Sequence, residues 1–188
     1  KSKDKKIVLI GEIHGTKEIP NLLTAFFSEY IVNHDFNICL ELASNAQKII
    51  DEFFKSGNIN AVKDIFYNSN ENDGRRSLEY LELIKKIYAL NKNYHKNTKI
   101  ICIDVDEDFN SKDFQNEREK VMAKNILRSL EGQTFVIFGN IHASRELIKI
   151  SNLSIKPTGF YLSQKLKNDL VAINITPKAG RFFNMSIK

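Results

Sequence analysis

The same pattern, Gly-x-x-His, follows an apolar run at two distant places in this chain of 188 residues. The first run, 7–10, leads into Gly11-Glu12-Ile13-His14, and the second, 135–138, leads into Gly139-Asn140-Ile141-His142. A short run that is apolar throughout is typical of a parallel strand covered on both faces. Ligands of open α/β sheets bind beyond the carboxyl ends of such strands. We therefore expect His14 and His142 to meet in one crevice.

Strand and helix patterns alternate along the rest of the chain. Apolar runs at 36–42 and 99–105 predict two more strands of the same kind, and apolar stripes with helical spacing predict helices between the runs. Such alternation favours an α/β fold with a mainly parallel β-sheet flanked by helices. We expect a single domain over 1–188 with a helical insertion at about 45–92. The smaller expected elements are a helix break near Gly57, a short helix from Ala143, a helix at 159–167, and strands at 169–176 and 182–187.

Carboxylates close two of the predicted strands. Glu41 ends the run 36–42, and Asp104 and Asp106 end the run 99–105. A carboxylate at the end of an apolar strand is costly to bury unless it has a partner. A solvated strand end explains each of them singly as well as a functional role does. Four successive strands that end in ionisable residues, however, predict a polar site at one edge of the sheet.

Two helices add basic and amide groups to this hypothesis. Arg75 and Arg76 open a predicted helix, where positive charge opposes the helix dipole, so either an acidic group compensates them or solvent hydrates them. Arg118 and Asn125 lie on one face of the helix predicted at about 115–131. That face either contributes to the polar site or is exposed to water.

Composition excludes some functions and partners. The formal net charge of +5 comes from lysines spread along the chain without a long basic run, so we expect no nucleic-acid partner. The longest apolar runs are shorter than the roughly 20 residues of a membrane span, so we expect no transmembrane segment. Cys39 and Cys102 lie within apolar strand patterns, which does not indicate a disulfide framework. The chain is expected to be a soluble domain, either cytoplasmic or exported after removal of a targeting segment.

Several segments between residue 7 and about 145 resemble the motifs of one superfamily, which contains Tiki/TraB, erythromycin esterase and ChaN-like proteins. These segments are Gly11-Glu12-Ile13-His14-Gly15-Thr16, Glu41, Asp73-Gly74-Arg75-Arg76-Ser77, Arg118-Glu119-x-x-Met122-Ala123-x-Asn125 and Gly139-Asn140-Ile141-His142-Ala143. The resemblance implies metal-dependent peptidase activity in Tiki-like members, macrolactone hydrolysis in the esterases, and haem binding in ChaN-like members.

The resemblance also assigns positions. It places His14 and His142 at the two histidines of the superfamily, Glu12 and Glu41 at its acidic positions, and Arg75 at its loop arginine, with Arg76 as the adjacent alternative. The chain is much shorter than the esterases, so we expect their additional macrolide-binding helices to be absent.

The leading hypothesis is a hydrolase that acts on an ester or amide of a small molecule or peptide. His14 would deprotonate a water molecule, Glu12 or Glu41 would orient the ring, and His142 with Arg75 would stabilise the oxyanion. The residues expected to bind substrate are Arg76, Arg118, Asn125, Asn140 and Asp104.

Two further hypotheses concern cofactors, and a third involves no activity. A divalent metal (Zn, Mn or Co) would be held by His14, His142 and Glu41, with an open position for water. Alternatively, the protein binds haem or another iron-bearing ligand in the ChaN manner without turnover. The third hypothesis is an α/β domain that keeps the motif and has lost the activity. The substrate and the oligomeric state stay open at this point.

Overall fold

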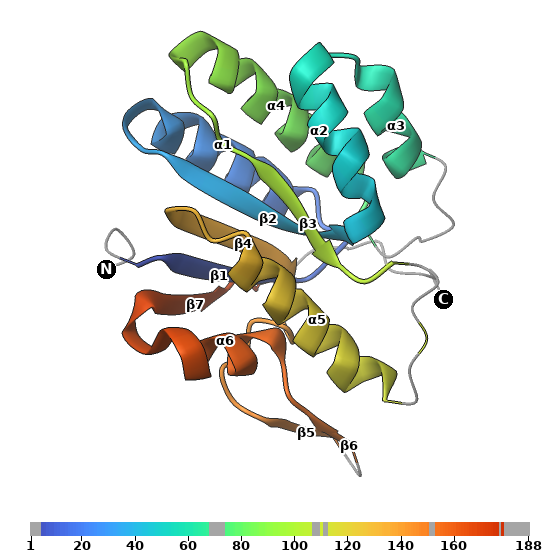
Figure 1. Cartoon of the computed structure of the whole chain (residues 1–188), viewed down its shortest axis with the longest axis vertical. Coiled ribbons are helices and arrows are strands. Elements are labelled where there is room, and N and C mark those ends of the chain that lie inside the picture. The colour runs from blue at the N-terminus through green and yellow to red at the C-terminus, as the bar shows by residue number, and fades with distance from the viewer. Residues whose placement is uncertain are drawn as a thin grey trace.

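Five parallel strands form the central sheet in the order β3-β2-β4-β1-β7 (Figure 1). Their bounds are β1 Ile7–Glu12, β2 Phe36–Ala43, β3 Ile100–Asp104, β4 Gln133–Gly139 and β7 Leu170–Asn174. The structure is a computed structural model that describes residues 5–67, 74–106, 110, 113–150, 153–176 and 178. Because all five strands are parallel, the predicted α/β fold with a mainly parallel sheet is confirmed.

The two strands that carry Gly-x-x-His are hydrogen-bonded neighbours. In the register of β1 with β4, Glu12 lies opposite Gly139. Strand β2 lies on the other side of β4 and ends beside β3, where Ala43 lies opposite Asp104. Because all these strands run in the same direction, their polar carboxyl ends meet at one edge of the sheet.

Helices cover both faces of the sheet, which explains why its strands are apolar throughout. On one side lie α1 (Glu18–Asn33), α2 (Gln47–Ser56), α3 (Ile59–Tyr67) and α4 (Leu78–Tyr94), and on the other lie α5 (Phe114–Arg128) and α6 (Thr158–Leu166) (Figure 1). Alternate residues of β1 point to opposite faces. Val8 and Ile10 join the core under the first set of helices, and Ile7 and Leu9 join the core under the second.

The break between α2 and α3 follows the sequence prediction. Gly57 adopts a left-handed conformation with φ of 75° and ends α2, and its backbone N–H donates to the carbonyl of Phe53 at 2.7 Å. The predicted strand at 182–187 lies wholly outside the described residues, as does most of the segment 68–74, whose polar composition predicts a loop. The remaining short elements are the 3₁₀ helices Ser44–Ala46 and Lys167–Asp169.

The predicted helix after Ala143 is wrong. Residues 141–147 form turns, and the chain continues into an antiparallel pair, β5 (Ile148–Ile150) and β6 (Leu153–Ile155). The Ser144 hydroxyl donates to the carbonyl of Glu146 at 3.1 Å and accepts from its backbone N–H at 3.3 Å. Such local bonds compete with helical pairing of the backbone, which accounts for the turn.

Two further sequence expectations concern the cysteines and membrane-spanning helices. Cys39 and Cys102 are free and buried, and burial raises the pKa of each thiol to about 12. In the part of the chain that the structure describes, no helix combines the length and apolar character needed to cross a membrane.

Candidate functional site

His14 lies between two buried carboxylates. Its Nδ1 is 2.9 Å from Oε1 of Glu12, which ends β1, and its Nε2 is 3.2 Å from Oε2 of Glu41 in β2. The side chains of Glu12 and Glu41 are 2% and 4% exposed, whereas that of His14 is 20% exposed. His14 is therefore the part of this trio that a ligand can reach.

Glu41 is the shared acceptor at the centre of the site. Besides His14, its Oε2 accepts the backbone N–H of Gly139 at 2.8 Å, which ties the end of β2 to the second Gly-x-x-His. Its Oε1 accepts from Nη2 of Arg118 at 2.5 Å and lies 3.5 Å from Nε2 of His142. One carboxylate thus holds both histidines and one guanidinium.

Asp104 at the end of β3 holds two arginines. Arg118 donates to it through two nitrogens, Nε to Oδ1 at 2.8 Å and Nη2 to Oδ2 at 2.7 Å. Nη1 of Arg75 donates to Oδ2 of Asp104 at 2.8 Å and lies 3.5 Å from Oε1 of Glu41. The paired geometry of Arg118 with Asp104 is the strong form of a charge-assisted hydrogen bond, and it fixes the plane of the guanidinium.

His142 is held by a second carboxylate that the sequence analysis did not assign to the site. Its Nδ1 lies 2.7 Å from Oε1 of Glu119, which is 0% exposed. Oε2 of Glu119 accepts from both the backbone N–H and the hydroxyl of Thr158, each at 2.8 Å, and Oε1 accepts from Gln115 at 2.8 Å. This buried carboxylate is fully satisfied, so it holds the imidazole in one orientation.

Two glycines allow these groups to approach closely. A Cβ on Gly139 would lie 3.1 Å from Nε2 of His14 and 3.3 Å from Cδ2 of His142, so the two rings flank this residue. Gly74 has φ of 86°, and a Cβ there would lie 2.2 Å from the backbone nitrogen of Gly15. A side chain at Gly74 would therefore push the backbone that carries Arg75 away from the first motif.

The histidines carry protons at neutral pH in this network. Burial disfavours the charged form of His14, but hydrogen bonds to Glu12 and Glu41 and their negative charges outweigh burial and raise its pKa to about 10. Burial also opposes protonation of His142, and the charges of Glu41 and Glu119 with their hydrogen bonds raise its pKa to about 9. Both rings are therefore imidazolium cations in the ligand-free protein.

The carboxylates respond in the opposite direction. Burial would raise the pKa of Glu41, yet the charges and hydrogen bonds of His142 and His14 hold it well below its usual value. The pKa of Glu119 is likewise lowered despite burial, by His142 and Thr158. Four positive groups therefore face four carboxylates, and the site is close to electrically neutral. The positive groups are His14, His142, Arg75 and Arg118, and the carboxylates are Glu12, Glu41, Asp104 and Glu119.

Two adjoining cavities open onto this network and share three residues: Glu41, Arg75 and Arg118. The first, of about 310 Å³, is lined by Glu12, Ile13, His14, Glu41, Arg75, Arg118, Gly139, Asn140, Ile141 and His142. The second, of about 210 Å³, is lined by Glu41, Ala43, Arg75, Arg76, Asp104, Val105, Asp106, Phe114 and Arg118. A ligand that spans both would pass over Arg75 and Arg118.

Most of the residues selected from sequence lie at these cavities, with one exception. Asn140 lines the first cavity and Arg76 the second. Asn125 lines neither, because its side-chain amide donates to the backbone carbonyl of Ile103 at 3.0 Å. Asn125 thus anchors α5 to β3 behind the site. Asp106 accepts from the Ser44 hydroxyl at 2.8 Å at the rim of the second cavity.

Sequence reasoning did not place Glu119, Thr158 or Tyr80 at the polar site. A signal for Glu119 was present, since the motif Arg118-Glu119-x-x-Met122-Ala123-x-Asn125 includes it. Thr158 gave no signal, because it is 39 residues away from Glu119 in sequence. Tyr80 on α4 is buried, and burial together with the nearby charges of Glu12 and Glu41 raises its pKa well above its usual value.

The expected metal ligands do not form a metal site. Both ring nitrogens of His14 already contact carboxylates, and Nη1 of Arg118 lies 3.4 Å from Nε2 of His142, where a cation would have to bind. Among the described residues, no group of three or more His, Cys, Asp or Glu side chains is arranged to hold a metal ion. The donor set therefore does not fit Zn, Mn or Co with His14, His142 and Glu41 as ligands.

Haem does not fit these two histidines either. An axial ligand must direct an unshared nitrogen at the iron, beside a broad apolar surface. His142 contacts Glu119 through Nδ1 and approaches Arg118 and Glu41 through Nε2. Seven of the ten residues that line the cavity of both histidines carry charged or polar side chains.

Comparisons with known proteins identify the class of fold. By sequence, neither the protein-family models nor the curated proteins give a match. By structure, the chain has the fold shared by an erythromycin esterase and the haem protein ChaN. The fold expected from the motifs is thus confirmed for these two groups, while none of these comparisons bears on the Tiki/TraB group.

The individual similarities are these. A mutant of the erythromycin esterase EreC in its open conformation matches with a TM-score of 0.69 and 11% identity, over 92% of this chain and 70% of that chain. ChaN of Campylobacter jejuni, described with cofacial haem binding, matches with a TM-score of 0.57 and 14% identity, over 96% and 88%. A bacterial protein toxin matches with a TM-score of 0.58 and 18% identity, over 92% of this chain and 34% of the toxin.

Proposed function

We propose that this protein hydrolyses an ester or amide bond in a small molecule or peptide. The observation that supports this most directly is the His14 ring at the mouth of a cavity, held by Glu12 and Glu41 on its two nitrogens. A positioned histidine with a carboxylate on its far nitrogen is the usual means of moving a proton in acyl transfer. The fold similarity to an esterase is consistent with this chemistry.

The charge state of His14 defines its role in this proposal. With a pKa of about 10, the ring is an imidazolium at neutral pH. It is therefore a proton donor at the start of the reaction, and the general-base role expected from sequence requires prior loss of that proton. In the proposed reaction, His14 gives its proton to the leaving oxygen or nitrogen, and the attacking water supplies the proton that restores the imidazolium.

The arginines supply the other requirement of acyl transfer, which is stabilisation of the oxyanion. Arg75 and Arg118 line both cavities, and Asp104 fixes both guanidiniums in place before substrate binds. Donors that are already oriented toward developing negative charge stabilise the transition state without reorganisation. The imidazolium of His142 adds a third positive charge at the same edge of the sheet.

The test is an activity screen with matched variants. The purified protein is assayed against p-nitrophenyl esters of increasing acyl size, simple lactones and chromogenic peptides, together with His14→Gln and His95→Gln. His95 is an exposed histidine at the end of α4, far from the motif in sequence, and serves as the control. We expect turnover in wild type and His95→Gln, and a loss of about 10²–10⁴-fold in His14→Gln.

Two outcomes would contradict the proposal. Undiminished hydrolysis in His14→Gln would show that another group moves the proton. If no substrate is turned over and the protein instead shows a Soret band on haem titration, the haem-binding alternative would replace the hydrolase. A Soret band unaffected by His14→Gln and His142→Gln would place that haem away from the site.

A further inference from the structure

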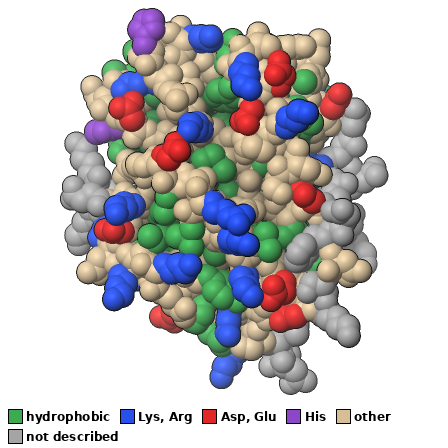
Figure 2. All heavy atoms as spheres, viewed as in Figure 1, with side chains coloured by type: hydrophobic (Ala, Val, Ile, Leu, Met, Phe, Trp, Pro, Cys, Tyr) green, Lys and Arg blue, Asp and Glu red, His purple; other side chains and the backbone are tan. Residues whose placement is uncertain are grey.

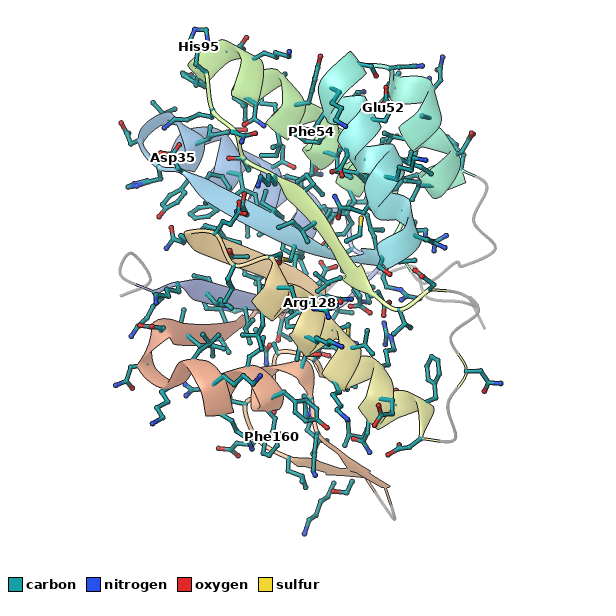
Figure 3. All side chains as sticks on the ribbon, viewed as in Figure 1. Asp35, Glu52, Phe54, His95, Arg128 and Phe160 are labelled. Atoms are coloured by element: carbon teal, nitrogen blue, oxygen red, sulfur yellow. The ribbon has the colours of Figure 1, made fainter. Side chains whose placement is uncertain are left out.

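A third cavity lies on the other side of α5, away from the charged site. It is a groove between α5 and α6 of about 480 Å³, larger than either cavity at the site, and shares no lining residue with them. We call it the α5/α6 groove. It is lined by Lys120, Ala123, Lys124, Leu127, Arg128, Tyr161, Gln164 and Lys165. Figure 3 shows Arg128 on α5 and Phe160 on the neighbouring α6.

The floor of the groove is apolar. Ala123 is buried, and Leu127 and Tyr161 are half-buried at the outer edge of the core between the two helices and the sheet. Leu127 and Tyr161 therefore offer apolar surface that the protein itself does not cover. An apolar chain laid against this surface would be removed from water.

The rim of the groove is basic. Lys120, Lys124 and Arg128 are exposed at successive i, i+4 positions of α5, and Lys165 faces the same groove from α6. Like charges at this spacing destabilise a helix. The helix dipole favours basic residues in a last turn, which accounts for Arg128 and Lys165 but not for Lys120 and Lys124. Helix stability alone does not explain this row of charges.

The protein leaves most of the rim without a paired carboxylate. Within the described ranges, no carboxylate forms an ion pair with Lys124, Arg128 or Lys165, and Lys120 pairs only with half-buried Glu117 at 3.6 Å. On the face that α5 and α6 form, basic side chains surround apolar surface (Figure 2). A ligand that complements this groove therefore carries a negative charge attached to an apolar chain.

The groove also has a direction. Burial raises the pKa of Tyr161, and the nearby charges of Glu117, Asp113 and Glu119, in the first half of α5 or at its N-cap, raise it further. Negative charge is therefore present at that end, and Lys124, Arg128 and Lys165 lie toward the other. An anionic head group would bind at the basic end, and an apolar chain would extend along Leu127 toward Tyr161.

We propose that the α5/α6 groove binds a single-chain amphiphilic anion, an alkyl carboxylate or alkyl phosphate in its free monomeric form. The head group contacts Lys124, Arg128 and Lys165, and the chain covers Leu127 and Tyr161. This proposal is independent of the hydrolase proposal, because the two sites share no residue. The groove is a second ligand site on the opposite side of α5 from His142.

The test uses decyl phosphate below its micelle concentration, with binding measured by isothermal titration calorimetry. Two probes separate the parts of the ligand: inorganic phosphate supplies the head alone, and decyl maltoside supplies the chain with a neutral head. We expect saturable one-site binding of decyl phosphate and at least tenfold weaker binding of each partial probe. Affinity should rise from hexyl to decyl phosphate by up to about fourfold for each methylene that becomes buried.

Variants locate the binding site. The double variant Lys124→Glu with Arg128→Glu brings the rim from four positive charges to a net charge of zero without touching a buried residue, and should weaken decyl phosphate binding by tenfold or more. The matched control is Lys55→Glu with Lys63→Glu, which makes the same charge change on exposed residues of α2 and α3. The control should bind as wild type does, which removes net charge as an explanation.

Three outcomes would overturn the proposal. Equal affinity in the rim variant and the control would place the ligand elsewhere. Binding only above the micelle concentration would show a surfactant effect rather than a site. Binding to vesicles of phosphatidylglycerol without binding to monomeric decyl phosphate would show that the basic face docks on anionic membranes and does not hold a single chain.

Discussion

Nε2 of His14 lies 3.2 Å from Oε2 of Glu41, so the nitrogen of this ring that is not bonded to Glu12 is also engaged by a carboxylate. The ligand-free site is therefore a closed set of ion pairs in which no base is free. A water molecule or a substrate oxygen that is to reach Nε2 must replace Glu41. Catalytic hydrogen bonds commonly rearrange in this way when substrate binds.

The pH dependence of kcat/KM distinguishes the two roles of His14. As a general acid, the ring is active in its protonated form, so kcat/KM should be constant near neutral pH and fall as pH rises through 9 to 10. As a general base, only about one ring in a thousand is neutral at pH 7, because each pH unit below the pKa reduces that form tenfold. Then kcat/KM should rise tenfold per unit toward pH 10. We expect the first profile, and the second would reverse the assignment.

The stability of the fold should also depend on pH through the two histidines. Their pKa values rise from 6.5 when unfolded to about 10 and about 9 when folded. A raised pKa means that the folded state binds the proton more tightly, so the stabilisation is complete below pH 6.5 and is lost as pH rises through 9 to 10. We expect the melting temperature to fall over this range.

A matched pair of variants tests whether this fall in melting temperature comes from the two histidines of the site. In His14→Gln the decrease should be smaller, because one of the two titrating groups is gone. His95→Asn should keep the full decrease, since His95 is exposed and asparagine tolerates its left-handed backbone, whose φ is 54°. A decrease of equal size in all three proteins would assign it to other groups, such as lysines.

Sequence predicts those parts of this structure that are specified by local patterns of residues. Continuous apolar runs indicate strands covered on both faces, and the position of Glu12 or Glu41 at the end of a run indicates a carboxyl edge of the sheet. These patterns place His14 and His142 at the same edge of the sheet. Their close approach depends on the strand order, in which β1 and β4 are neighbours.

The parts that sequence does not predict depend on tertiary contacts. Thr158 reaches Glu119 only because α6 packs beside α5, and no spacing in the sequence indicates that pairing. Asn125 lies on the same helix face as Arg118, yet its side-chain amide donates to the backbone carbonyl of Ile103 and does not line the cavity. Protonation of His14 is likewise set by two carboxylates converging from different strands, a property of the assembled site.

The position of Arg118 predicts that the site does not bind a divalent metal. Its Nη1 lies 3.4 Å from Nε2 of His142, and a guanidinium at that point repels a divalent cation. We expect dialysis against EDTA to leave both turnover and melting temperature unchanged, and Zn²⁺ to give no rise in melting temperature. A metal that binds the folded state must raise it. A rise with Zn²⁺ that disappears in His14→Gln would show that the network opens to accept a metal.

The last prediction concerns Glu119, which we infer to be a positioning residue for His142. In Glu119→Gln, one side-chain oxygen becomes an NH₂ group, although Oε1 faces His142 and Gln115 while Oε2 faces Thr158. Either orientation of the amide places a donor against a donor, and the negative charge is lost. An opposite charge at hydrogen-bonding distance shifts a pKa by about 1–3 units.

We therefore expect an NMR titration of the His142 ring in Glu119→Gln to give a pKa lower than about 9 by about one unit or more. It should not return to 6.5, because Glu41 still lies 3.5 Å from Nε2. Thr158→Val is the control: it removes one hydroxyl bond to Glu119 and keeps the charge, so the pKa of His142 should change little. This measurement requires no substrate, and it therefore holds whether or not the hydrolase proposal does. An unchanged pKa of His142 in folded Glu119→Gln would show that Glu41 alone holds the proton on His142 and that Glu119 only fills the space between α5 and α6.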